Sequence, residues 1–409
     1  MRLKLQNIGI IESADINIDG ITLIAGQNDS GKSTVGKVLY AVIKGFNQDP
    51  NHFQEENNGM IMYHYQNILK ELKKNYSDDI TQYQTKEINE KWILKIEDLI
   101  NKEAVPEEIK KPIIDKLFFL KLYLKNEFNS VDHKKSEIQS WLNSEMRTLF
   151  NLFRNEQEST INIDDLEGNA TINSWFSGKE NFFIKLDKNI ETYYKEAYFI
   201  ESPLIIDEAL QRFVGQDNFK IYNRSRHEEL AKSLSNQLPT NSVDYSTIIK
   251  QISKIIDGEI AVDLLEGVRF IKNNQDIAIK NTAVGIKSFG LIQLLLKNNR
   301  LNSRSLLIID EPEVHLHPTW QVKYAEILVI LSKEFDVPIV LTSHSPYFIE
   351  ALEAFTKKYS YEKSTNFYFA EKSLDGLSSK ITDVSEDISP ILSSISEAFY
   401  TIQDINDED

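Results

Sequence analysis

A glycine-rich segment near the start of the chain carries the residues whose chemistry is clearest. Gly26-Gln-Asn-Asp-Ser-Gly-Lys-Ser33 fits the phosphate-binding pattern GxxxxGK[ST]. The apolar stretch 21–25 before it predicts a strand, and the apolar spacing over 35–42 predicts a helix after it. Glycine allows a turn tight enough for successive N–H groups to surround phosphates, and the helix start adds partial positive charge. The segment therefore predicts a loop that binds the phosphates of a nucleotide.

The side chains of this loop have separate expected roles. We expect Lys32 to reach the β- and γ-phosphates of ATP and the Ser33 hydroxyl to bind Mg²⁺. The remaining residues of the segment that we expect to contact the nucleotide are Gly26, Asn28, Ser30, Gly31 and Thr34. The loop thus predicts ATP and Mg²⁺ as cofactors.

Two adjacent carboxylates close a second apolar strand, predicted over 305–309. Asp310 is placed to hold Mg²⁺, directly or through water, and Glu311 to polarise an attacking water. An acidic cap with a purely structural role fits poorly, because two neighbouring carboxylates at a sheet edge are costly without a cation. The pair favours hydrolysis of ATP to ADP and phosphate.

Three histidines follow these carboxylates. His344 comes just after a third apolar strand, 338–341, where its side chain can contact the γ-phosphate, although a lone histidine is more often structural. His315 and His317 could suggest a metal pair, but no suitable third ligand is near them in the sequence. The chain has no cysteine, which excludes disulfides, thiolate zinc sites and cysteine nucleophiles.

Strands and helices must alternate to position these residues. Apolar runs separated by helices near 285–297 and 319–334 predict an α/β fold with a largely parallel sheet covered on both faces. Residues 2–8 and 14–18 read as strands of an N-terminal antiparallel part. Asp19-Gly20, between alternating segments, predicts a hairpin turn into the next strand.

We expect four regions along the chain. They are an N-terminal lobe with the phosphate-binding loop (1–48), a mainly helical insertion (49–195), a C-terminal lobe (196–358) and an acidic tail (359–409). In the C-terminal lobe, 258–281 reads as a strand meander and the polar stretch 215–243 as a mobile loop. The end of the tail is either solvated and disordered or one amphipathic helix that packs on the body.

The charge and the apolar content of the chain limit the kinds of partner that we expect. The formal charge of −16 speaks against an overall electrostatic grip on nucleic acid. Residues 381–409 carry eight of the acids and no Lys or Arg, so a basic patch elsewhere stays open. No apolar run approaches the ~18 residues that span a membrane, and no signal peptide precedes the first strand. We therefore expect a cytoplasmic protein without a membrane partner.

These motifs, in this order, resemble the ABC-type ATPase heads of the SMC, RecF and OLD families. Asp310-Glu-Pro-Glu-Val-His-Leu-His-Pro318 is similar to the combined Walker B and D-loop of the OLD/RecF-like branch. The resemblance covers about residues 1–48 and 195–355. It implies an ABC-type P-loop head with an inserted helical subdomain, in which two chains sandwich two Mg-ATP molecules as a homodimer or higher homo-oligomer.

The resemblance also implies a signature motif that contacts the γ-phosphate bound to the opposite chain. Its best match is 282–290, where Gly285 and Lys287 are the candidate contacts and Ala283 replaces the usual serine. Lys287 and the helix start would supply positive potential across the interface. The resemblance also implies a Q-loop glutamine, which no residue of this sequence clearly matches; Glu201 is a weak candidate for that region.

Family comparison also narrows the biological setting. The segment after His344 is too short for the TOPRIM nuclease of OLD proteins, and the zinc-hook cysteines of repair ATPases are missing. What remains resembles the stand-alone ATPases of anti-phage systems such as Septu and PARIS, which act with a separate nuclease or toxin effector. The alternative is a RecF/SMC-like DNA-repair ATPase that acts on DNA directly. Its candidate basic residues are Lys70, Lys73, Lys74, Lys110, Lys111, Lys134 and Lys135. A transporter nucleotide-binding domain fits poorly, because the signature is degenerate and the insertion large.

Overall fold

The computed structural model divides the chain into two compact units, which we describe separately. The larger unit comprises 1–47, 134–217 and 224–409, and the smaller one comprises 48–133 and 218–223. The structure describes residues 1–47, 61–62, 65–74, 85, 88–102, 110, 113–114, 116–117, 120–121, 159–165, 168–174, 192–207, 226–235, 237–239, 243–263 and 267–395.

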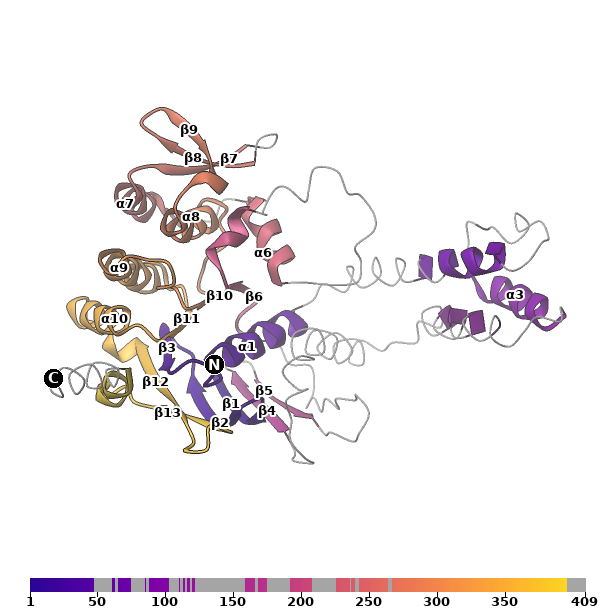
Figure 1. Ribbon diagram of the computed structural model, residues 1–409, viewed down its shortest axis with the longest axis horizontal. Coiled ribbons are helices and arrows are strands. Elements are labelled where there is room, and N and C mark those ends of the chain that lie inside the picture. Colours follow the sequence, from indigo (N-terminus) through magenta and orange to yellow (C-terminus); the bar gives the residue numbers. More distant parts are fainter. Residues whose placement is uncertain are drawn as a thin grey trace, which may run out of the picture. The chain divides into compact units, whose positions relative to one another are not determined.

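One ten-stranded sheet organises the larger unit (Figure 1). Its strands lie in the order β5-β4-β1-β2-β13-β12-β3-β11-β10-β6. The run from β12 to β6 is parallel, and β1, β2, β4 and β5 form an antiparallel part. The bounds are β1 Arg2–Ile8, β2 Ile11–Asn17, β3 Ile21–Gly26, β4 Ser159–Asp165, β5 Gly168–Ser174, β6 Glu196–Ile200, β10 Ser305–Asp310, β11 Ile339–Ser343, β12 Thr365–Lys372 and β13 Ser379–Asp383. The predicted mostly parallel α/β sheet with an antiparallel part is confirmed.

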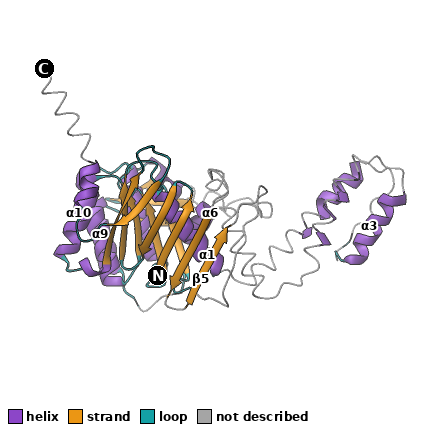
Figure 2. Ribbon diagram, turned by 90° about the horizontal axis from the view of Figure 1, so that it is seen from below, coloured by secondary structure: helices purple, strands orange, loops and turns teal. Residues whose placement is uncertain are grey.

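Both faces of the parallel part are buried, as its uninterrupted apolar strands require. Successive side chains of a strand point to opposite faces, so Leu307 and Ile309 enter one core and Leu306 and Ile308 the other. Helix α1 covers the second face, and α7 to α10 line the first. Figure 2 shows the strands side by side with helices packed against them. The helices are α1 Lys32–Phe46, α7 Ser246–Ile256, α8 Val284–Lys297, α9 Pro318–Phe335 and α10 Pro346–Lys358.

A second, three-stranded sheet matches the meander expected over 258–281. It consists of β7 Glu259–Asp263, β8 Gly267–Lys272 and β9 Gln275–Ala278, followed by the short 3-10 helix η3 Ile279–Asn281. Buried Gln293 of α8 accepts a hydrogen bond from the Ile260 N–H at 2.7 Å. The meander is thus attached directly to α8.

The predicted hairpin at Asp19-Gly20 is wrong, although the chain does turn there. Strands β12 and β13 lie between β2 and β3, so these two consecutive strands are not paired. Gly20 has φ +52°, and a Cβ on it would lie 2.2 Å from the Ser364 carbonyl oxygen. The glycine therefore admits the C-terminal chain beside the turn. The local sequence signal correctly predicts a turn and incorrectly predicts that the two strands pair with each other.

The expected tail and insertion also differ from the structure. Within 359–409, β12 and β13 are strands of the main sheet, and Ile388 and Ile391 are buried in its core. Within 49–195, β4 and β5 extend the antiparallel part through pairing of β4 with β1. Strand β12 reads as Thr-Asn-Phe-Tyr-Phe-Ala and buries both of its faces in the sheet. The acidic composition of the segment that follows concealed this contribution to the fold. Residues 396–409 lie outside the described residues.

Part of the stretch expected to be a mobile loop is helical. Helix α6, Arg226–Ser235, lies within 215–243 and buries Leu230, Ala231 and Leu234. These residues recur at the spacing of one helix face. Their short run in a polar context concealed the helix.

The smaller unit has its own helical core. Helix α3, Glu90–Lys102, buries Trp92, Ile93, Ile96 and Ile100. In 107–128 the helical spacing of Ile113, Leu117, Leu120 and Leu124 predicts one apolar stripe, and the first three of these residues are buried. Leu124 and the segment 134–155, whose sequence pattern also predicts a helix, lie outside the described residues.

Removing the C-terminal strands tests their place in the sheet. A chain ending at residue 358 should fail to give soluble, cooperatively unfolding protein, because it loses β12 beside β3. Burial of Phe367, Tyr368 and Phe369 contributes about 1.5–3 kcal/mol each, which together is comparable with the about 5–15 kcal/mol stability of a typical domain. The full-length chain with Leu374→Ala, an exposed residue between β12 and β13, is the control and should keep its melting temperature in circular dichroism. Normal folding of the shorter chain would contradict the topology.

Candidate active site

The carboxyl ends of the parallel strands meet at one edge of the main sheet, where the chemistry-bearing residues collect. Ala25 of β3 pairs with Ser343 of β11, and Asp310 of β10 pairs with Thr342 of β11. The loop after β3 and the turns after β10 and β11 are therefore neighbours. Ligands bind at this edge in open α/β sheets.

Two glycines shape the loop between β3 and α1. Gly31 is the N-cap of α1 with φ +87°, and a Cβ on it would lie 2.7 Å from Ile11 Cγ1. Gly26 has φ +153°, and a Cβ there would lie 2.4 Å from the Ala370 carbonyl oxygen. Any other residue would be strained at either position. Strand β12 thus contributes to the shape of the loop.

A pocket of about 230 Å³ lies over this loop. Its lining consists of Asn28, Asp29, Ser30, Gly31, Lys32, Ser33, Thr34 and Glu311. Every one of these except Glu311 comes from the loop or the first turn of α1, where backbone N–H groups point outward. The structure thus brings most of the predicted loop residues together around one cavity, with the predicted water-polarising carboxylate at its wall.

Lys32 is buried at the base of this pocket, with 4 % of its surface exposed. Its Nζ donates hydrogen bonds to the carbonyl oxygens of Gly26 at 3.0 Å and Gln27 at 2.8 Å. Burial lowers the pKa of Lys32, and the nearby Glu311 and Asp310 oppose this shift. An ammonium held this way can exchange carbonyl partners for phosphate oxygens without first losing a hydration shell.

Asp310 and Ser33 place two oxygen donors side by side. Ser33 Oγ donates to Asp310 Oδ1 at 2.9 Å, and the Thr342 hydroxyl donates to the same oxygen. Burial raises the pKa of Asp310, while these two hydrogen bonds oppose the shift. A hydroxyl and a carboxylate at this distance suit Mg²⁺, which keeps several waters and takes few protein ligands.

Glu311 and His344 face each other across the ends of β10 and β11. His344 Nδ1 lies 3.2 Å from Glu311 Oε1, without the alignment of a hydrogen bond. Glu311 has φ +49°, which is rare for a residue with a side chain. Its N–H donates to the Thr342 hydroxyl at 3.0 Å and is held there. Strained backbone of this kind clusters at functional sites.

Glu201 follows β6 at the same edge. A hydrogen bond with His227 lowers the pKa of Glu201 to about 2, and Arg226 and Lys37 add to the shift. Lys37 Nζ lies 3.8 Å from Glu201 Oε1, and Arg226 Nη2 lies 3.4 Å from Oε2. The carboxylate therefore links α1 to α6 and stays charged at neutral pH.

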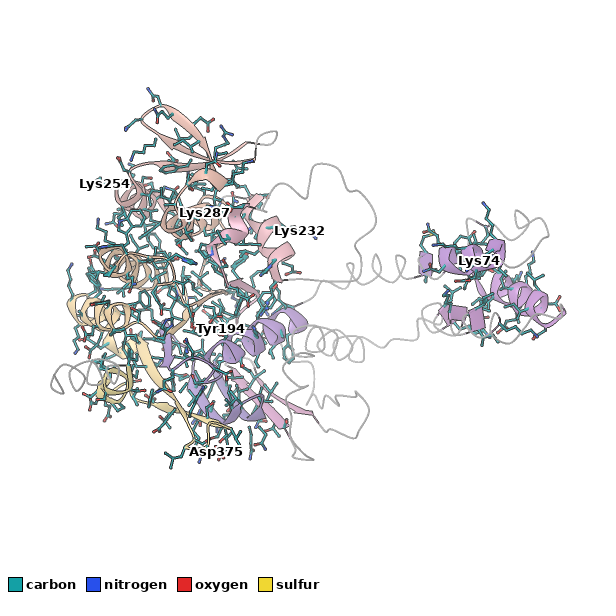
Figure 3. The ribbon with its side chains drawn as sticks, in the orientation of Figure 1. Lys74, Tyr194, Lys232, Lys254, Lys287 and Asp375 are labelled. Atoms are coloured by element: carbon teal, nitrogen blue, oxygen red, sulfur yellow. The ribbon has the colours of Figure 1, made fainter. Side chains whose placement is uncertain are left out.

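The signature-like segment lies elsewhere in the larger unit, and Lys287 requires a correction. Residues 282–290 form the start of α8, and none of them is in the lining of the pocket. Lys287, labelled in Figure 3, is 3 % exposed, and its Nζ donates to Asp207 Oδ2 at 2.6 Å. Asp207 ends the 3-10 helix η2, Pro203–Asp207. A buried, ion-paired ammonium is not displayed at an interface, so Lys287 fixes α8 to η2.

Gly285 and His317 have visible structural roles. A Cβ on Gly285 would lie 2.9 Å from Trp320, so the glycine allows α8 and α9 to pack closely. His317 is the N-cap of α9 and accepts a hydrogen bond from the Thr319 N–H. Within the residues described here, no group of three or more His, Asp or Glu side chains could hold a metal ion.

Sequence reasoning missed three side chains that organise this edge. Thr342 binds both Asp310 and the Glu311 backbone. Glu313 and Gln321 are buried polar residues that bind the turn after β11. Glu313 lies inside the motif 310–318 and close after an apolar strand, and this position was the available signal in the sequence. Nothing in the sequence distinguished Thr342 or Gln321.

Comparison with known proteins identifies the family of the chain. The family described as the AAA ATPase domain (AAA_15) matches residues 1–349, and the chain belongs to this family. It is therefore a nucleotide-binding protein that hydrolyses ATP, as the sequence predicted. Among the described residues, no helix is long and apolar enough to cross a membrane.

The individual proteins and solved structures that align with this chain have low sequence identity to it. The chain is 23 % identical over 372 residues to the Retron Vc95 probable ATPase of Vibrio cholerae serotype O1 biovar El Tor. That alignment covers 80 % of this chain and 66 % of the relative, which is just under two thirds of its length. The SMC head domain from Thermotoga maritima aligns at 10 % identity and a TM-score of 0.39, covering 94 % of this chain and 98 % of that one. An ATP-binding cassette of an ABC transporter aligns at 11 % identity and a TM-score of 0.36, covering 98 % and 99 %.

Lys32 offers a direct test of the pocket. Lys32→Ala should abolish measurable ATP binding at micromolar concentration, since hydrogen bonds to charged groups contribute about 1.5–3 kcal/mol each. Fluorescence titration with a labelled ATP analogue measures the loss. Lys357→Ala is the matched control, because Lys357 is an exposed lysine that pairs with Glu353 on α10. Retained affinity in the Lys32 variant would remove the phosphate-binding assignment.

Proposed function

We propose that two copies of this chain close around two Mg-ATP molecules, with each hydrolytic site built from both copies. The pocket supports this proposal most directly. Its described lining holds the loop and Glu311 of one chain, and it leaves out the signature-like start of α8. A second copy turned head to head would bring its α8 to the open side of the pocket.

The start of α8 has the properties that such a contact needs. Its N-cap, Ala283, is exposed and has no side chain that can satisfy the first N–H groups of the helix. These N–H groups and the positive end of the helix favour an anion, here the γ-phosphate of ATP bound to the partner. Gly285 keeps this turn close to α9 and free of a bulky side chain.

In the proposed reaction the residues of the first chain have separate roles. Lys32 Nζ binds the β- and γ-phosphates, and the loop N–H groups from 26 to 34 hold the remaining phosphate oxygens. Ser33 and Asp310 hold Mg²⁺, which neutralises charge that develops on the phosphates. Glu311 orients and polarises the attacking water, and His344 contacts the γ-phosphate from the neighbouring turn.

A hydrolysis-deficient variant tests the composite site. Glu311→Gln keeps the shape of the side chain and removes the carboxylate, so ATP should trap a closed dimer that light scattering after gel filtration detects. Ala283→Asp in the same background should prevent this dimer, because it adds negative charge where the partner's γ-phosphate binds. Aspartate is also a good helix N-cap, so α8 itself should remain stable. A Glu311→Gln chain that stays monomeric in micromolar ATP would contradict the composite site.

At the level of the cell, we propose a regulatory ATPase of an anti-phage defence system, acting with a separate nuclease or toxin. The similarity to a protein named as the probable ATPase of a retron supports a role within a system of several components. An ATP-driven switch between open and closed pairs could restrain or release such an effector, since a ligand shifts an equilibrium through its differential affinity for the two states. We place this activity in the cytoplasm.

Co-purification tests the cellular role separately. Tagged Glu311→Gln chain, isolated from its own host in ATP, should bring down a stoichiometric nuclease or toxin subunit that mass spectrometry identifies. Lys32→Ala is the control, because it should not hold the ATP-bound state. Recovery of replication or repair factors with bound DNA would instead support a DNA-repair ATPase.

A further inference from the structure

A single carboxylate oxygen holds the turn that carries His344. Glu313 is 4 % exposed, and its Oε1 accepts a hydrogen bond from Ser343 Oγ at 2.7 Å. The same oxygen accepts from the backbone N–H groups of His344 at 2.9 Å and Ser345 at 3.2 Å. These donors are the last residue of β11 and the two residues that join it to α10. The turn is therefore fixed to the segment that follows β10.

A carboxylate in this position is costly for stability. Burial raises the pKa of Glu313, while the hydrogen bonds from Ser343 and His344 oppose that shift. Its other oxygen, Oε2, is buried and has no hydrogen-bond partner among the described residues. Buried charges often contribute less to stability than apolar residues of the same size. A geometric role accounts for a glutamate here better than stability does.

A second buried contact fixes the same turn. Ser345 Oγ donates to Gln321 Oε1 at 2.7 Å, and Gln321 Nε2 donates to the Leu316 carbonyl oxygen at 3.0 Å. Leu316 belongs to the same stretch, 311–317, as Glu313. The turn is thus attached at two points to one segment, whose first residue is Glu311.

We propose that Glu313 is a positioning residue for ATP hydrolysis, which sets the place of His344 relative to Glu311. The inference rests on the proposed contact of His344 with the γ-phosphate. The His344 ring lies with Nδ1 3.2 Å from Glu311 Oε1 and 3.5 Å from Glu313 Oε1, so Glu313 contacts both the ring and the turn that carries it. Without the Glu313 carboxylate, both N–H groups of the turn lose their acceptor and His344 can move away from the γ-phosphate.

Kinetics of paired Glu313 variants test the role. Glu313→Ala should lower kcat on the order of 10²-fold, the size of effect that a misplacement of about 1 Å produces. Its ATP affinity should stay close to that of the unaltered chain, because the phosphate-binding loop makes no hydrogen bond to Glu313. Glu313→Gln should recover most of kcat, since its amide oxygen can accept from the same donors. Glu326→Ala, which removes a carboxylate on α9 that binds Lys358 and Tyr359, is the control and should leave kcat unchanged.

A double-mutant cycle shows whether Glu313 acts through His344. If it does, Glu313→Ala combined with His344→Ala should be no slower than His344→Ala alone. Independent, multiplicative losses would overturn the inference, as would an unchanged kcat in Glu313→Ala. A His344→Ala chain with unchanged kcat would instead remove the proposed role of His344, which makes the two failures distinguishable.

A further pair of variants keeps the test decisive if Glu313→Ala does not fold. Glu313→Asp keeps the charge but is too short to reach all the donors of the turn, whereas Glu313→Gln keeps the reach and loses the charge. Positioning predicts that the Asp variant loses kcat and the Gln variant retains it. The reverse order would show that charge matters rather than position, and would overturn the inference.

Discussion

Lys32, Asp310 and Glu313 lie largely out of water at one edge of a sheet, and the cost of desolvating these charges governs the construction around them. Burial favours the neutral form of each group: it lowers the pKa of Lys32 and raises the pKa of Asp310 and Glu313. The fold opposes this with fixed partners: loop carbonyls for Lys32, hydroxyls for Asp310, and hydroxyl and N–H donors for Glu313. The polar groups are therefore oriented before any nucleotide arrives, which is the condition for effective electrostatic catalysis.

Parallel pairing makes this concentration of charge achievable. Strands β3, β10 and β11 each end at the same edge, so residues far apart in the chain meet without long excursions. Helices on both faces exclude water from the strands themselves. Within these three strands only Asp310, the last residue of β10, is partly exposed, and the other chemistry-bearing groups lie in the loop and turns that follow the strands.

Local patterns in the sequence predicted the parts of the fold that depend on neighbours in the chain. The GxxxxGK[ST] loop, the acidic end of β10 and the meander of β7 to β9 were all visible, because their signals span a few residues. Contacts between distant segments were not predicted. The pairing of Lys287 with Asp207 crosses 80 positions, and Ser379 donates to the Ser30 carbonyl oxygen from 349 positions away. No periodicity or propensity encodes such a partner.

The same limit explains the wrong predictions. Asp19-Gly20 has the composition of a hairpin turn, but strand pairing is decided by which other strands compete for the same edge. The C-terminal strands won that competition, since β12 offers apolar side chains to both faces of the sheet. The acids that follow β12 give this part of the chain the composition of a solvated tail, which conceals the apolar strand.

The position of β12 has a consequence for how the protein is made. The strand that leads into the phosphate-binding loop, Ile21–Gly26, is synthesised long before one of its two neighbours, Thr365–Lys372. During translation the pairing of β3 is complete only after β12 has been made, and contacts of such long sequence separation form slowly. A nascent chain that ends before β12 therefore lacks one neighbour of the strand that leads into the phosphate-binding loop, together with the Ala370 carbonyl that lies against Gly26.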